Sequence, residues 1–181
     1  MRRAWRALRS CISSPADLWL LARIAAWALV LPVLKRLVPL RRLVALMAAE
    51  PRRSERDADL ERRITRMARL VYRGRRATFR DNCLERSLVT YRYLARAGAQ
   101  PRLLVGVGRS ETASVRGHAW VTLDGRAVHD QEEELAEHAE LTAFGPDGHR
   151  VSAGRAGSPP RPEGRPEAGS EPKRSPGIGR G

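Results

Sequence analysis

The sequence predicts an α+β protein, in which a helical N-terminal half is followed by a helix packed on a small antiparallel sheet. Three observations predict this class. Apolar residues recur at helical spacing in the first half of the chain, they alternate with other residues in the second half, and an Asp-Gly pair between two apolar segments marks a β-hairpin. The 181 residues allow one domain of ordinary size and a tail.

The N-terminal segment, residues 1–53, is basic and apolar. Its stretch Leu18–Val38 is strongly apolar, but Arg23 interrupts it and Pro32 is expected to kink a helix there. The uninterrupted apolar run Ile24–Leu34 is shorter than the roughly 20 residues that span a bilayer. The stretch is also a poor signal peptide, because no small-residue cleavage site accompanies it.

We therefore expect core helices, or helices that pack on a partner, with breaks at Pro39 and Pro51. A membrane-surface helix is the alternative, because basic residues flank the stretch and Trp5, Trp19 and Trp27 are available for an interface. The sequence alone leaves both open.

The core is expected to cover residues 54–150 and to begin with a helix that opens between Ser54 and Leu60 and runs to about Tyr72. One face of this helix is apolar, and arginines occupy the other. The apolar residues are Leu60, Ile64, Met67 and Val71. Residues 73–76 link this helix to the next.

A third helix is predicted to begin at Cys83. Asp81 or Asn82 can cap it, and Glu85 lies three residues after Asn82, as in a capping box. Gly98 can adopt the left-handed backbone conformation that commonly ends a helix. The apolar stripe of the helix is Leu84, Leu88, Tyr91 and Ala95. Cys83 therefore falls in the first turn, where unpaired amides and the helix dipole stabilise a thiolate and the same amides can hold an oxyanion.

Strands follow the third helix. Alternation predicts a first strand over Arg102–Gly108, and its alternating apolar residues are Leu103, Val105 and Val107. After a polar loop over residues 109–116, the segments HAWVTL and RAVHD flank the Asp-Gly pair at residues 124–125. A short acidic helix or turn is expected over Glu132–Leu141. Residues 151–181 are predicted to be a disordered tail, because they contain almost no apolar residues to bury.

Cys83, His118 and Asp130 are the candidate catalytic residues. In that order they supply a thiol nucleophile, a base that deprotonates it and a carboxylate that orients the base. Each alone has a plain structural interpretation, as a small buried side chain, a strand histidine and a turn acid. Their joint arrangement is what points to nucleophilic catalysis.

The register of the hairpin determines whether the side chains of His118 and Asp130 can meet. A two-residue loop pairs Leu123 with Arg126 and sends His118 and Asp130 to opposite faces of the sheet. A three-residue loop with a left-handed Gly125 pairs residue 122 with residue 126 and places His118 directly opposite Asp130. The catalytic interpretation is expected to require the three-residue loop.

The motifs CLERSL, GVG and GHAWVTLDG and the final Asp130 together resemble the transglutaminase-like cysteine peptidases that remove the leader in lasso-peptide biosynthesis. The resemblance covers roughly Leu60–Phe144. It implies a papain-like or transglutaminase-like core, with Cys83 as nucleophile, His118 as general base and acid, and Asp130 as orienting carboxylate. It also implies a stand-alone peptidase, because no strand pattern precedes Arg102 where some members carry a recognition domain.

The implied partners are a precursor peptide through its leader region and a separate leader-binding recognition protein, with the lasso cyclase and a membrane surface as further candidates. Residues 1–80 carry 20 lysines and arginines and 6 acids, a net +14, which suits an acidic leader or another anionic partner. Nucleic acid is disfavoured, because no recognition motif accompanies the charge. Two rival functions are another acyl-transfer or amide-forming enzyme of the same type, and a non-catalytic basic adaptor at a membrane or nucleic acid.

Two cysteines give no disulfide framework, and a cytoplasmic protein with a free Cys83 is expected, with membrane association left open. Cys11 is interpreted as incidental. No cofactor or metal is expected, since His129, His138 and His149 lack zinc-ligand spacing.

Overall fold

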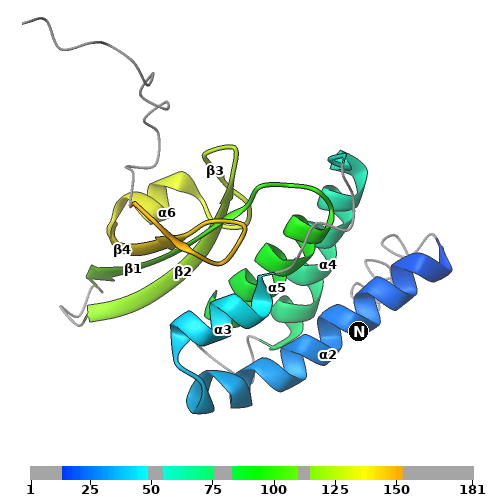
Figure 1. Ribbon diagram of the computed structural model, residues 1–181, viewed down its shortest axis with the longest axis horizontal. Coiled ribbons are helices and arrows are strands. Elements are labelled where there is room, and N and C mark those ends of the chain that lie inside the picture. Colours follow the sequence, from blue (N-terminus) through cyan, green and yellow to red (C-terminus); the bar gives the residue numbers. More distant parts are fainter. Residues whose placement is uncertain (1–13, 49–54, 76–82, 110–114, 153–181) are drawn as a thin grey trace, which may run out of the picture.

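The computed structural model describes residues 14–48, 55–75, 83–109 and 115–152, and it confirms the α+β class (Figure 1). The helices that precede the sheet are α2 (Pro15–Leu37), α3 (Leu40–Met47), α4 (Ala58–Arg75) and α5 (Cys83–Arg96). The remaining elements are β1 (Arg102–Arg109), β2 (Val115–Leu123), β3 (Arg126–Ala127), α6 (Glu132–Ala136), β4 (His138–Phe144) and β5 (Arg150–Val151). Among the described residues, no strand precedes β1.

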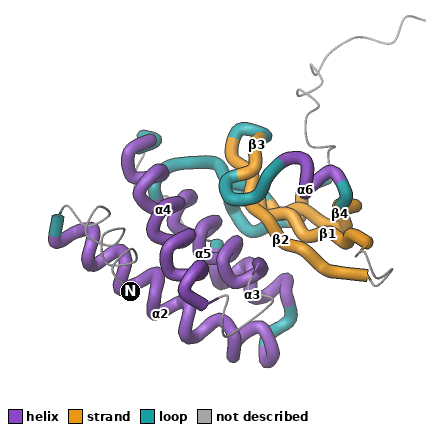
Figure 2. The backbone as a smooth tube through the Cα atoms, turned by 180° about the vertical axis from the view of Figure 1, so that it is seen from behind, coloured by secondary structure: helices purple, strands orange, loops and turns teal. Residues whose placement is uncertain are grey.

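The strands form one antiparallel sheet in the order β3-β2-β1-β4-β5. Figures 1 and 2 show the sheet on one side of α5 and the other long helices on its other side. Leu103, Val121 and Phe144 of the sheet join the same buried cluster as the apolar residues of α2 to α5. The helix that begins at Cys83 is therefore the central element of the core.

Ten of the fourteen residues of α5 are buried. Leu88, Tyr91 and Ala95 of the predicted stripe are among them, and Leu84 is half-buried. Gly98 has φ 84° just after the helix, which confirms the predicted left-handed stop. The predicted caps, Asp81 and Asn82, lie outside the described residues.

α2 is one continuous helix that passes through Pro32, and it ends before Pro39 as predicted. Ile24, Ala28 and Leu31 on its inner side are almost completely buried. The helix is longer than its uninterrupted apolar run, and it is long and apolar enough to cross a membrane. Core helices of soluble proteins and signal sequences can have the same length and composition. The predicted break at Pro51 lies outside the described residues.

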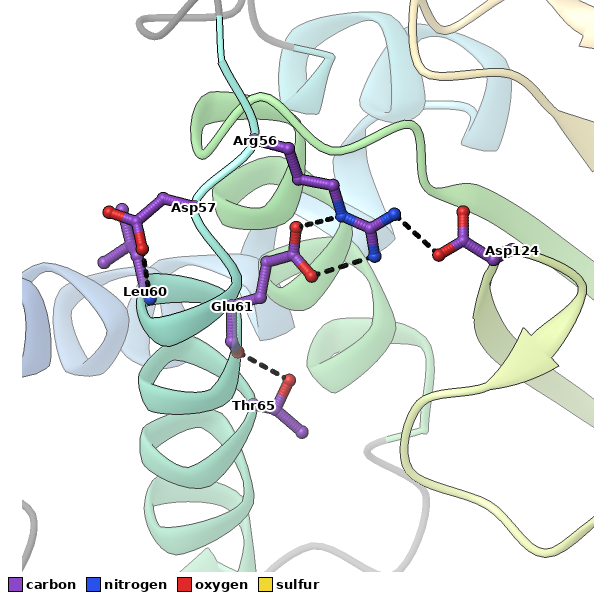
Figure 3. Close-up of polar contacts among 6 residues, drawn as sticks. All are labelled: Arg56, Asp57, Leu60, Glu61, Thr65 and Asp124. Atoms are coloured by element: carbon purple, nitrogen blue, oxygen red, sulfur yellow. Dashed lines mark hydrogen bonds and ion pairs between the residues drawn. The ribbon is translucent and has the colours of Figure 1, made fainter.

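α4 is held to the β2–β3 hairpin by a bridge at its start (Figure 3). Asp57 caps the helix by accepting a hydrogen bond from the Leu60 amide at 2.9 Å. The Arg56 guanidinium donates two hydrogen bonds to Glu61, at 2.6 and 3.1 Å, and pairs with Asp124 in the hairpin turn at 2.6 Å. This bridge fixes the tip of the hairpin against the helical layer.

The hairpin has the two-residue loop, so the expected three-residue register is wrong. Leu123 pairs with Arg126 and Thr122 pairs with Ala127. Asp124 has φ 53° and Gly125 has φ 79°. A two-residue turn with positive φ at both central residues matches the natural twist of two antiparallel strands. The positive φ of Gly125 confirms the predicted left-handed conformation.

The segment after the hairpin was predicted as one short acidic helix or turn over Glu132–Leu141, and the structure divides it. α6 stops at Ala136, and His138–Phe144 forms β4 between β1 and β5. Alanine and glutamate have low intrinsic strand preference, so the local pattern argued against a strand. The unpaired edge of β1 overrides that preference, because its backbone groups need partners.

We expect Gly106→Ala to destabilise the fold by about 1–3 kcal/mol, through overpacking. A Cβ at this β1 position would lie 2.5 Å from the Ala139 carbonyl oxygen and 2.9 Å from the Trp120 ring, where the β1–β4 register shifts. Gly117 in β2 is the matched control, because a Cβ there meets nothing within 4 Å. Thermal unfolding should show a lower Tm for the first variant and not for the second. Equal Tm values would contradict the packing of β4 on β1.

Candidate active site

The sulfur of Cys83 lies at the first residue of α5 and is partly exposed. It is hydrogen-bonded to the His118 ring and to the backbone amides of Ala119 and Leu84. Ser87, one turn along α5, donates a hydrogen bond to the Ala119 carbonyl at 2.8 Å and so ties the start of the helix to β2. Cys83 is a free cysteine, and Cys11 lies outside the described residues.

His118 lies on β2, where it pairs with Gly106 of β1. Its Nε2 lies 3.6 Å from Oδ1 of Asp130. Because Nε2 faces the carboxylate, Nδ1 is the nitrogen left for the Cys83 sulfur. The structure therefore brings Cys83, His118 and Asp130 together in the order that the sequence predicted.

Asp130 reaches His118 although the hairpin has the two-residue register. β3 ends at Ala127, and Val128 makes the last ladder contact through its amide, which donates to the Val121 carbonyl at 3.0 Å. Residues 128–130 then form a bend and leave the ladder. Strand alternation no longer fixes the direction of their side chains, so the expected need for a three-residue loop was wrong.

The charges of the pair follow from these contacts. Burial alone would raise the pKa of the Cys83 thiol, but the His118 ring and the two backbone amides together lower it below its ordinary value. The Asp130 carboxylate, and after it the Cys83 sulfur, raise the pKa of His118 from 6.5 to about 9. Each shift favours the charged form of its group, so the contacts of the site favour a thiolate beside an imidazolium.

Arg86 holds the carboxylate and is a site residue that the sequence analysis missed. Its guanidinium lies 2.6 Å from Oδ1 of Asp130, and both side chains are about nine-tenths buried. Burial would raise the pKa of Asp130, but His118 and Arg86 together lower it, so the carboxylate stays ionised. The available signal was spacing, because Arg86 lies three residues after Cys83 and hence on the same face of the helix.

His129 anchors the bend to α5, a role that the sequence did not indicate. Its Nε2 lies 2.8 Å from Oγ1 of Thr90, within hydrogen-bond distance. Burial, and after it the nearby Arg86 and Arg69, lower the pKa of His129 to about 4, so this ring is neutral. It therefore positions its neighbour Asp130 without competing for the imidazolium charge.

Two further rings surround His118. The Trp120 indole stacks on it at a centroid distance of 5.8 Å, and the His138 ring of β4 lies 5.0 Å away. Trp120 is almost completely buried, so its ring limits water on that side of the imidazolium. Within the described ranges, no group of three or more potential ligands could hold a metal ion.

A comparison of the sequence with known protein families gives a match. The family model described as the transglutaminase-like superfamily matches residues 25–143, a range that includes all three candidate residues. No curated protein and no solved structure matches the chain.

The charges of Cys83 and His118 predict how the reactivity of the thiol depends on pH. Alkylation of Cys83 by iodoacetamide should have a midpoint below the ordinary thiol value of 9.0, because the thiolate is favoured. His118→Ala should raise that midpoint, since burial then acts without the imidazolium. The rate of alkylation should not decline above pH 9. The rate of any reaction that needs the His118 proton should decline there, because the pKa of the ring is about 9. An unchanged midpoint in His118→Ala would contradict the pair.

Arg86 can be tested by substitution. Arg86→Met removes one of the two cations that face the buried Asp130 carboxylate, and we expect a loss of stability of about 3 kcal/mol and at least a ten-fold loss of activity. Arg86→Lys should recover stability more than activity, because lysine keeps the charge and loses the planar fork. Arg92→Met is the control on the same helix, since Arg92 donates to carbonyls of α3 instead. Equal activity losses in the two methionine variants would rule out a positioning role for Arg86.

Proposed function

Because the chain belongs to the transglutaminase-like superfamily, we propose that it is a cysteine peptidase that removes the leader from a ribosomally made lasso-peptide precursor. Members of this superfamily are typically enzymes, either cysteine peptidases or acyltransferases. The observation that carries the proposal is the thiol–imidazole pair with an ionised carboxylate behind it. The motifs CLERSL and GHAWVTLDG support the narrower assignment to leader removal.

In the proposed mechanism, the Cys83 thiolate attacks the carbonyl carbon of the scissile peptide bond. We propose that amides at the start of α5 stabilise the oxyanion that forms. His118 then gives its proton to the leaving amine, and the C–N bond breaks to leave a thioester on Cys83. Asp130 stabilises the imidazolium while it carries that proton.

The second half returns the enzyme to its starting state. Neutral His118 takes a proton from water, and the resulting hydroxide attacks the thioester carbonyl. The C–S bond breaks, the leader leaves as a carboxylic acid, and the thiolate and imidazolium are restored. If an amine attacked instead of water, the same site would form an amide, so the products distinguish a peptidase from an acyltransferase.

The proposed partners come from the family resemblance and from the charge of the N-terminal half. A separate recognition protein is proposed to hold the leader, because the resemblance to the stand-alone leader peptidases implies one. The N-terminal excess of arginines suits an acidic leader or partner, and the lasso cyclase is the proposed consumer of the released core peptide. A non-catalytic adaptor remains the competing proposal, and it requires function without Cys83.

The proposal predicts that Cys83→Ala and His118→Ala abolish leader cleavage and that Asp130→Asn keeps the fold but lowers activity by orders of magnitude. General-base assistance alone contributes roughly 10²–10⁴-fold. The assay is incubation with a precursor peptide and its leader-binding partner, followed by mass spectrometry of the products.

Cys11→Ala is the matched control and should retain cleavage. More than a tenth of the activity remaining in Cys83→Ala would contradict the peptidase proposal. A cross-linked or isopeptide product that depends on Cys83 would assign the site to acyl transfer instead.

A further inference from the structure

The outward side of α2 is an apolar surface with nothing packed on it among the described residues. We call it the α2 outer face. It consists of Leu18, Trp19, Ala22, Ala26, Leu29, Val30, Val33 and Leu37, all exposed. Trp19 is 65% exposed, Leu29 68% and Leu37 74%. Positions three or four residues apart share one side of a helix, so this face is a continuous strip about 28 Å long.

The opposite side of α2 is fixed to the protein. Ile24, Ala28 and Leu31 are buried in the main core, which also contains residues of α4 and α5. Asp17 pairs with Arg63 of α4 at 3.0 Å, and Lys35 pairs with Glu85 of α5 at 2.7 Å. Both carboxylates are only 3% exposed. Moving α2 across a bilayer would break both pairs and leave buried charges behind, which is costly.

The segment of the chain that carries the α2 outer face and continues into α3 is basic. From Leu18 to Ala48 the sequence contains no acidic residue. Arg36, Arg41 and Arg42 are exposed where α2 ends and α3 begins, after the C-terminal end of the apolar strip at Leu37. An apolar helix face with a tryptophan and neighbouring arginines is the composition of a helix that lies in the membrane interface.

We propose that the α2 outer face binds the surface of an anionic lipid bilayer, with α2 lying in the plane of the interface and still packed on the protein. The apolar side chains enter the boundary between headgroups and acyl chains. The arginines contact anionic headgroups. This inference does not depend on the proposed peptidase activity.

A second copy of the chain is the less favourable occupant. Each copy carries a formal net charge of +14, so pairing two of these basic faces brings like charges together. An anionic bilayer instead offers both an apolar layer and the opposite charge. Charge complementarity therefore favours the lipid surface.

The proposed orientation places the active site on the side of α5 that faces away from the membrane. In Figures 1 and 2, α2 lies on the far side of α5 from the sheet. Glu85, which pairs with Lys35 of α2, is only two residues from Cys83. The Cys83 sulfur contacts β2 on the sheet side of α5. Both α5 and α2 therefore lie between the thiol and the α2 outer face, a separation of about 20 Å at roughly 10 Å per helix.

The test is co-sedimentation of the full chain with vesicles of phosphatidylcholine alone or with about one-third phosphatidylglycerol. We expect binding to the mixed vesicles, and weaker binding as salt rises. Leu29→Glu/Val33→Glu should lower the affinity at least ten-fold. Arg41→Glu/Arg42→Glu should do the same, because each arginine near an anionic surface contributes about five-fold.

Leu141→Glu is the matched control, because Leu141 is 60% exposed but lies on β4. It should bind like the unaltered chain. Circular dichroism and the alkylation rate of Cys83 should be unchanged in every variant, which excludes misfolding as the cause of lost binding.

Three results would overturn the proposal: no binding to either vesicle, equal binding by Leu29→Glu/Val33→Glu, or resistance to alkaline extraction, which would indicate a spanning helix. A dimer in light scattering that Leu29→Glu/Val33→Glu disrupts would assign the face to a second copy. Peptide cleavage is measured separately, in solution without vesicles. Failure of the membrane proposal therefore leaves the peptidase proposal testable, and the reverse also holds.

Discussion

The burial of α5 on all sides is the constraint on which the rest of the structure depends. A helix enclosed between a sheet and other helices cannot leave a charged side chain unpaired, because an isolated buried charge is too costly. Glu85 is therefore paired with Lys35, and Arg86 with Asp130. The first pair ties the start of α5 to α2, and the second ties it to the bend after β3. The same two contacts thus fix Cys83 and deliver a carboxylate to His118.

This arrangement explains why one segment carries both stability and chemistry. The apolar residues of α5 form the centre of the core, while its first turn presents the thiol at the edge of the sheet. Amides of that turn and of β2 contact the sulfur, so the backbone that starts the helix also favours the thiolate. The neutral His129 and the ring of Trp120 complete the surroundings, one holding the bend and the other covering the imidazolium.

The sequence predicted the features that depend on local pattern. Helical spacing placed Cys83 at a helix start, alternation placed β1, and the Asp-Gly pair placed the hairpin turn and the positive φ of Gly125. The sequence-based prediction failed where contacts between residues far apart in the chain determine the structure. β4 forms because β1 needs a second partner, which its own residues do not reveal.

The position of Asp130 shows the same limit at the site. Alternation along a strand was extended to a residue that lies beyond the end of β3, where it no longer applies. Arg86 was missed for a related reason. Its partner is 44 residues away in the chain, so only the folded structure pairs them.

The central claim is that Cys83 acts as a nucleophile in a site charged by His118. Intact-mass spectrometry of the protein, quenched in acid shortly after mixing with a precursor peptide and its leader-binding partner, tests it most directly. The account predicts a transient adduct with the mass of the acyl leader, located on Cys83 and sensitive to hydroxylamine, as thioesters are. Cleavage with no adduct at any time, together with full turnover by Cys83→Ala, would contradict it.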